Sequence, residues 1–156
     1  MGFHLQIREI PVSAQGDALQ VQAWQNAIWN HIDQFKIWDG NRDPDFGPIF
    51  GPVSVRIKWY VNNLKTKKPC TDISFGDLDN MAKSILDALK DNGLADDKKR
   101  RLIEDDSMVV ELALSKHDLS IIRPDRKGHP LQLQADLCIE EGRDLVEIIV
   151  TQVWLG

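Results

Sequence analysis

Residues 76–93, GDLDNMAKSILDALKDNG, decide the fold and raise the question of function. Their apolar positions recur at steps of three and four, which predicts a helix with one apolar face over about 78–92. Gly93 supplies the usual C-terminal stop. The apolar face is made of Leu78, Met81, Ala82, Ile85, Leu86 and Leu89. This helix needs a partner layer on which to bury that face.

The segments around this helix supply the partner layer. Alternating apolar and polar residues predict strands, and a second three-and-four pattern predicts another helix, for which Ser13 can be the cap. The strands are expected at 3–10, 53–61, 108–115 and 145–154, the helix at 19–35 and a loop at 39–52. The segment 117–142 is expected to be an extended hairpin or a mobile arm. The whole chain, 1–156, then forms one domain with an α+β fold, a small mixed β-sheet of about four strands with two helices packed on one face.

Composition and charge narrow the class of protein. The chain has 156 residues and a formal net charge of −5, which disfavours a strongly basic nucleic-acid binder and leaves phosphate binding to local clusters. Its two cysteines, Cys70 and Cys138, fit neither a zinc site nor a disulfide scaffold. With no signal pattern and no apolar run long enough to cross a bilayer, we expect a cytoplasmic protein with no membrane partner.

The acids at the start of the 78–92 helix have two interpretations. An isolated Asp-x-Asp is most often a helix cap. Here, however, Asp77 and Asp79 can project to the same side of an extended lead-in, where they repel each other unless a cation lies between them. Lys83 stands one turn further on. A second acidic group, residues 104–106, precedes a predicted strand and could return to the first pair.

Such a convergence of carboxylates predicts a metal site. Oxygen ligands without His or Cys suit Mg²⁺, with Mn²⁺ as a possible substitute. A divalent ion of this kind activates water and neutralises charge during phosphoryl transfer.

The stretch from Asp77 to Glu111, DLDNMAKSILDALKDNG followed by EDDSMVVE, resembles the RusA family of Holliday-junction resolvases. The resemblance rests on an Asp-x-Asp-Asn-x-x-Lys opening, an apolar helix and an acid pair before a Val-rich strand. It implies a homodimeric, Mg²⁺-dependent endodeoxyribonuclease that cuts four-way or other branched DNA. By position, the implied metal ligands are Asp77, Asp79 and Asp106, and the implied catalytic set is these three with Lys83.

Several assignments stay open. Asp106 best matches the third acid, because a strand follows it, but Asp105 or the pair at 96–97 could supply that carboxylate. The candidate nucleic-acid-binding residues are Lys65, Lys67, Lys68 and Asn80. The basic run 98–101 is either a solvated connector or a phosphate-contacting loop. Trp29 and Trp38 are candidates for an exposed dimer surface.

Two other functions fit the same residues. One is a branched-DNA-binding protein of this fold that has lost efficient catalysis, which the acidic net charge favours. The other is a nuclease for branched DNA other than four-way junctions.

Overall fold

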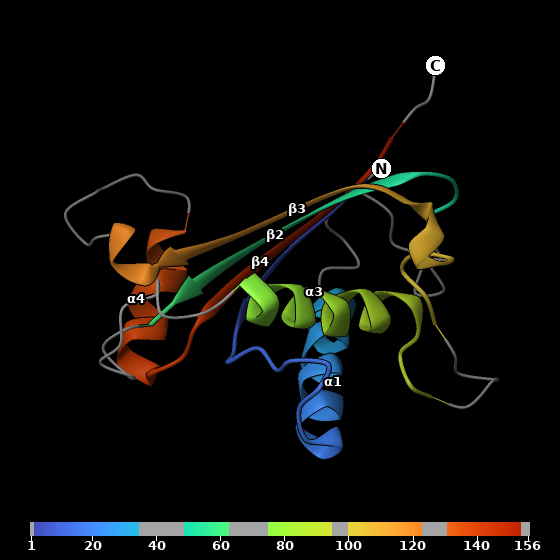
Figure 1. The fold of residues 1–156 in the computed structure, drawn as a ribbon. Coiled ribbons are helices and arrows are strands. Elements are labelled where there is room, and N and C mark those ends of the chain that lie inside the picture. The colour runs from blue at the N-terminus through green and yellow to red at the C-terminus, as the bar shows by residue number, and fades with distance from the viewer. Residues whose placement is uncertain (1, 35–48, 63–74, 95–99, 123–130, 154–156) are drawn as a thin grey trace.

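The computed structural model describes residues 2–34, 49–62, 75–94, 100–122 and 131–153. These form a four-stranded sheet of order β1-β4-β2-β3 (Figure 1). The strands are β1 (Gly2–Arg8), β2 (Val53–Val61), β3 (Val109–Asp118) and β4 (Leu145–Gln152). Strand β2 is antiparallel to β4 and parallel to β3, and β4 is antiparallel to β1. The mixed sheet and its helices confirm the α+β prediction.

Two helices, α1 (Ala18–Gln34) and α3 (Phe75–Lys90), lie on one face of this sheet (Figure 1). Their apolar faces and the alternate residues of the strands form the main core, because strand side chains alternate between faces whereas helix side chains recur every three or four positions. Members from three elements are Ile28, Val55, Ile57, Ile85 and Leu89, each with no exposed surface.

A third helix, α4 (Gln132–Glu141), lies at one end of the sheet (Figure 1). The prediction of an extended hairpin or arm over 117–142 is therefore wrong. The structure has the 3₁₀ turn η4 (Leu119–Ile121) and then α4, which ends at Gly142 with φ 68°. Of the five apolar residues in α4 only Ala135 and Cys138 are buried, and Leu133 is 71% exposed, so the apolar positions of this segment do not mark one buried helical face in the sequence.

Asp144 joins the end of β2 to the start of β4. Its carboxylate accepts hydrogen bonds from Trp59 Nε1 at 3.0 Å and from the backbone N–H of Asn62 at 2.9 Å. The Asn62 side chain donates in turn to the backbone oxygen of Cys138 at 3.1 Å. Because Asp144 is only 5% exposed, it is a buried acid held by its donors.

The start of α1 also differs from the sequence prediction. Asp17, not Ser13, caps the helix: its Oδ1 accepts from the backbone N–H groups of Leu19 at 3.0 Å and Gln20 at 3.3 Å. Ser13 Oγ instead accepts from the backbone of Gln15. Among the described residues, no helix is both long and apolar enough to cross a membrane.

Candidate metal centre

The first turn of α3 is held in place by the segment that follows β1. The backbone N–H of Ala14 donates to the carbonyl oxygen of Asn80 at 3.1 Å, and Ser84 Oγ lies 2.7 Å from the carbonyl oxygen of Val12. Leu78 is buried in the core, so the helix has a fixed rotation about its axis. Asp79 and Lys83 consequently face outward, both exposed and one turn apart.

The backbone of Asp77 lies in this same turn. Its side chain lies outside the described part of the chain. The positive end of the helix dipole points at this turn and favours carboxylates there.

The opposite end of α3 receives the returning chain. The carbonyl oxygen of Leu89, one of those left without an intrahelical partner, accepts from the backbone N–H groups of Leu102 at 2.7 Å and Ile103 at 3.2 Å. Asn92 Oδ1 accepts from the backbone of Arg100 at 3.1 Å. The chain then enters the 3₁₀ turn η3 (Asp106–Met108), which leads directly into β3.

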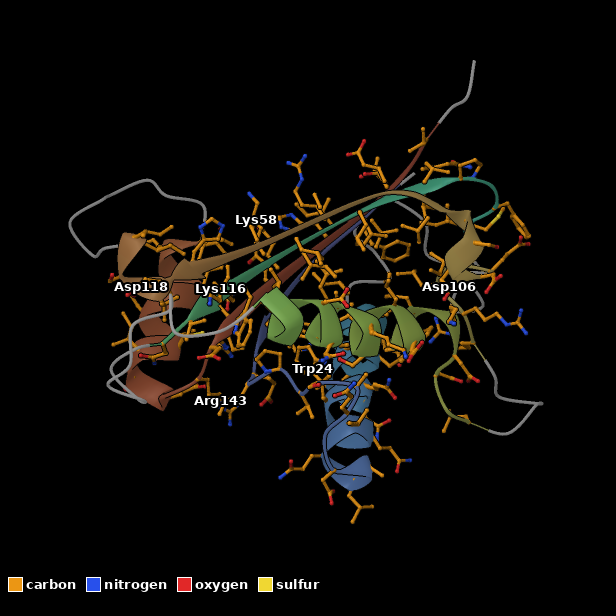
Figure 2. All side chains as sticks on the ribbon, viewed as in Figure 1. Trp24, Lys58, Asp106, Lys116, Asp118 and Arg143 are labelled. Carbon is orange, nitrogen blue, oxygen red and sulfur yellow. The ribbon has the colours of Figure 1, made fainter. Side chains whose placement is uncertain are left out.

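Asp106 lies beside this carboxyl end, as Figure 2 shows. Lys90 Nζ is 3.2 Å from Asp106 Oδ2 and 3.6 Å from Asp87 Oδ1. Desolvation acts to lower the pKa of Lys90, but the hydrogen bond and charge of Asp106, together with Asp87, outweigh it and raise that pKa. Lys90 was not among the predicted site residues, although its spacing from Asp87 is that of a helical ion pair.

Asp105 is held by its own neighbours. Ser107 Oγ donates to Asp105 Oδ2 at 2.8 Å. That hydrogen bond, followed by hydrogen bonding involving Asp106, lowers the pKa of the Asp105 carboxyl. The acid pair before β3 is therefore an ordered, exposed feature rather than part of the core.

Asp79 and Asp106 thus lie near opposite ends of one helix. Asp79 is eleven residues from Lys90 in α3, which at about 1.5 Å per residue is about 16 Å along the axis. A Mg²⁺ ion sits only about 2.1 Å from each of its ligands. Within the described residues of one chain, no group of three His, Cys, Asp or Glu side chains could hold a metal. The expected return of the 104–106 acids to the start of the helix does not occur within one chain.

The connection between β2 and β3 explains this outcome. These strands are parallel, so α3 must carry the chain back along the sheet in the opposite direction. The residues just before β3 lie near the end of α3, and the start of α3 lies farther along the sheet, in the direction of the end of β2. Any acid in the position of Asp106 is placed far from Asp79 by this topology.

The model of one protein family, Endodeoxyribonuclease RusA, matches residues 15–121, which is more than half of the chain. The chain belongs to the RusA family. This is a family of endodeoxyribonucleases whose members act on Holliday-junction DNA. A comparison with curated proteins finds no match to the chain.

Some of the residues that the sequence singled out lie in the described part of this RusA chain, and others do not. The structure does not describe Lys65, Lys67 or Lys68. It also does not describe the segment 95–99, with its acids and lysines, or Trp38. Arg100 is described: it pairs with Asp33, and its guanidinium carbon is 5.2 Å from the ring centroid of Trp29. Arg100 therefore braces α1, which is a structural role.

Trp29 is not the exposed residue that the sequence suggested. It is buried in the core, and its Nε1 donates to the carbonyl oxygen of Ala88 at 2.7 Å. This bond joins α1 to α3. The indole is consequently inaccessible as a dimer contact, and any interface must use other residues.

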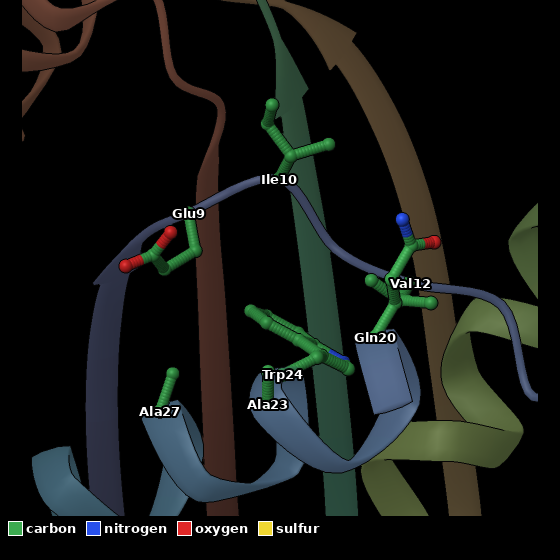
Figure 3. Close-up of a pocket in the computed structure, with 7 residues that line it drawn as sticks. All are labelled: Glu9, Ile10, Val12, Gln20, Ala23, Trp24 and Ala27. Atoms are coloured by element: carbon green, nitrogen blue, oxygen red, sulfur yellow. The ribbon is translucent and has the colours of Figure 1, made fainter. Parts of the chain in front are cut away.

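A pocket of about 430 Å³ lies between α1 and the segment after β1 (Figure 3). Its lining residues are Glu9, Ile10, Val12, Gln20, Ala23, Trp24 and Ala27. Glu9 is the one charged member, and it pairs with Arg143 at 3.2 Å. Neither Asp79 nor Asp106 is among these lining residues of the RusA chain, and both lie on exposed surface near the two ends of α3.

Proposed function

We propose that this chain is a Mg²⁺-dependent endonuclease that cuts four-way DNA junctions as a homodimer. The supporting observation is that Asp79 and Lys83 stand side by side and exposed at the start of a helix that lies within the RusA match. An acid and a cation in one exposed patch can hold a metal ion and a phosphate next to each other.

The carboxylate oxygens are donors that suit Mg²⁺, but the described residues of a single chain do not bring three of them together. The Asp77, Asp79 and Asp106 carboxylates are oxygen donors of the kind that Mg²⁺ prefers. Because α3 separates Asp79 from Asp106, we infer that each metal site takes the first two acids from one copy and Asp106 from the other. A two-fold axis makes this exchange reciprocal and generates two identical sites.

The chain's own residues then have distinct roles. The three carboxylates would hold the ion, which when bound lowers the pKa of coordinated water and stabilises negative charge on the phosphate. Lys83 would place a fixed positive charge at the scissile phosphate. Lys65, Lys67 and Lys68, with Asn80, would contact the DNA backbone. Two sites in one dimer would cut two strands of the junction.

The test is incubation of the purified protein with end-labelled four-way, flap and linear DNA, with and without Mg²⁺. We expect Mg²⁺-dependent nicking of the four-way junction, its loss in Asp79→Asn and its retention in Asp136→Asn, a matched exposed carboxylate on α4. Binding of the junction without nicking by the unmodified chain would instead support a binding protein of the same fold. Preferential cutting of the flap would assign a different branched substrate.

A further inference from the structure

The pocket between α1 and the segment after β1 holds a buried hydrogen-bond donor without an acceptor. Trp24 lines this pocket and is only 3% exposed. Its Nε1 has no hydrogen-bond partner among the described residues. The other two tryptophans that the structure describes each have one, because Trp29 donates to Ala88 and Trp59 donates to Asp144. Buried indole N–H groups are normally paired, so the N–H of Trp24 is an exception that a ligand would explain.

The nitrogen end of the Trp24 ring faces other residues of the pocket. Figure 3 shows this end of the ring on the side of Val12 and Gln20, which are both lining residues. Helix side chains lean toward the N-terminus of their helix, which brings the indole toward Gln20, one turn earlier. Because Gln20 is exposed, movement of its side chain can open a path from solvent to the N–H.

The rest of the pocket is shaped for an apolar group. Ala23 and Ala27 stand one turn apart on α1, and their small side chains leave a space of about 430 Å³ beside the indole. Ile10, on the segment that faces α1, is 45% exposed, and Leu19, one turn before Ala23, is 76% exposed. Ligand sites in proteins are mostly apolar with a few directed polar groups. This pocket has that character, with the N–H of Trp24 as its buried donor.

The charges around the pocket disfavour nucleic acid as its occupant. From Glu9 to Gln34, a stretch that includes α1, the sequence has three acids and no lysine or arginine. Glu9 is the charged residue of the lining, and it is paired with Arg143 at 3.2 Å. A surface that binds nucleic acid needs basic residues to meet the phosphates. The pocket therefore suits a neutral or basic partner.

We propose that this pocket binds a partner protein by taking one bulky apolar side chain of that protein, while Trp24 Nε1 donates to a backbone carbonyl oxygen next to it. A peptide segment supplies both features together, since each residue carries a carbonyl group beside its side chain. The exposed side chains of Ile10 and Leu19 extend the apolar contact around this anchor. The inference is independent of the proposed function, because neither Asp79 nor Asp106 lines the pocket.

The experiment is a heteronuclear NMR titration of the isotope-labelled protein that follows the indole N–H signal of Trp24, which the variant Trp24→Phe assigns. The probe is N-acetyl-phenylalanine amide, which carries an apolar side chain between two carbonyl groups. The comparison probes are N-acetyl-glycine amide, which lacks that side chain, and a single-stranded oligothymidylate. Ala23→Leu fills the pocket. Ala18→Leu is the matched control, because Ala18 is an exposed alanine of α1 that does not line the pocket.

We expect N-acetyl-phenylalanine amide to move the Trp24 N–H proton signal downfield to saturation, because a new hydrogen bond deshields that proton. The shift should be absent with N-acetyl-glycine amide and in Ala23→Leu, and unchanged in Ala18→Leu, with the remaining signals showing that each variant is folded. A shift that does not saturate, an equal shift in Ala23→Leu, or a larger shift with the oligothymidylate would overturn the proposal. A Trp24 signal that moves on dilution of the protein alone would also overturn it, by assigning the pocket to a second copy of the chain.

Discussion

Mixing two inactive variants tests whether the acids of one site come from two copies. Asp79→Asn and Asp106→Asn each alter one proposed ligand, and both positions are exposed, so the fold is retained. Asp106→Asn weakens the ion pair between Asp106 and Lys90. This pair is exposed, so its contribution to the free energy of unfolding is at most about 1 kcal/mol. Circular dichroism of each variant checks that it is folded.

The expected magnitude follows from the site composition. Equal mixing with free exchange makes about half of the dimers mixed, and each mixed dimer has one site with both altered residues and one site with neither. About a quarter of the wild-type number of sites is therefore restored. The nicking rate of a four-way junction should rise from near zero for each variant to about a quarter of wild type. Paired cutting of two strands should stay absent.

The alternative arrangement gives a different result. If each copy holds all three acids itself, a mixed dimer has one altered residue in each site and no intact site. A mixture as inactive as its two components, with subunit exchange demonstrated by fluorescence transfer, would refute the two-copy site.

Three further predictions concern the fold. Asp144→Ala leaves the buried N–H of Asn62 and the half-buried Nε1–H of Trp59 without their acceptor and should lower the free energy of unfolding in urea by about 3 kcal/mol, whereas the exposed Asp136→Ala should change it by less than about 0.5 kcal/mol. Cys138, whose pKa burial raises to about 12, should resist alkylation at pH 8 in the native protein and react within minutes in urea; rapid native labelling would contradict the buried thiol. Burial and then the charge of Lys58 lower the pKa of His117, so the native state binds fewer protons than the unfolded state near pH 6. Stability should therefore fall as pH drops from 7.5 to 5.5, and less steeply in His117→Gln.

The sequence predicts the strands and the two long helices well because each has a clear period. Residues 53–61 alternate and become β2, with Val53, Val55 and Ile57 buried, and residues 78–92 show the helical period that becomes most of α3. The α4 helix lacks such a signal, since its burial depends on Tyr60 and Leu145 from distant strands. Contacts with residues distant in the sequence therefore determine that this segment forms a helix.

The residues of the metal site stay a prediction, but the structure does place some of them. Spacing and the family resemblance single out the carboxylates and Lys83, yet the place of Asp106 depends on the parallel pairing of β2 with β3, which the spacing does not encode. Recognising that parallel strands require a helix running in the opposite direction would have placed Asp106 at the far end of α3.

The most direct test of the two-copy metal centre is Mn²⁺ binding, measured by the loss of the free-ion electron paramagnetic resonance signal. Protein concentrations should span the dissociation of the dimer, followed in parallel by sedimentation. We predict that bound Mn²⁺ rises with the dimer fraction and is lost in both Asp79→Asn and Asp106→Asn. Equally tight binding by the monomer would contradict the account.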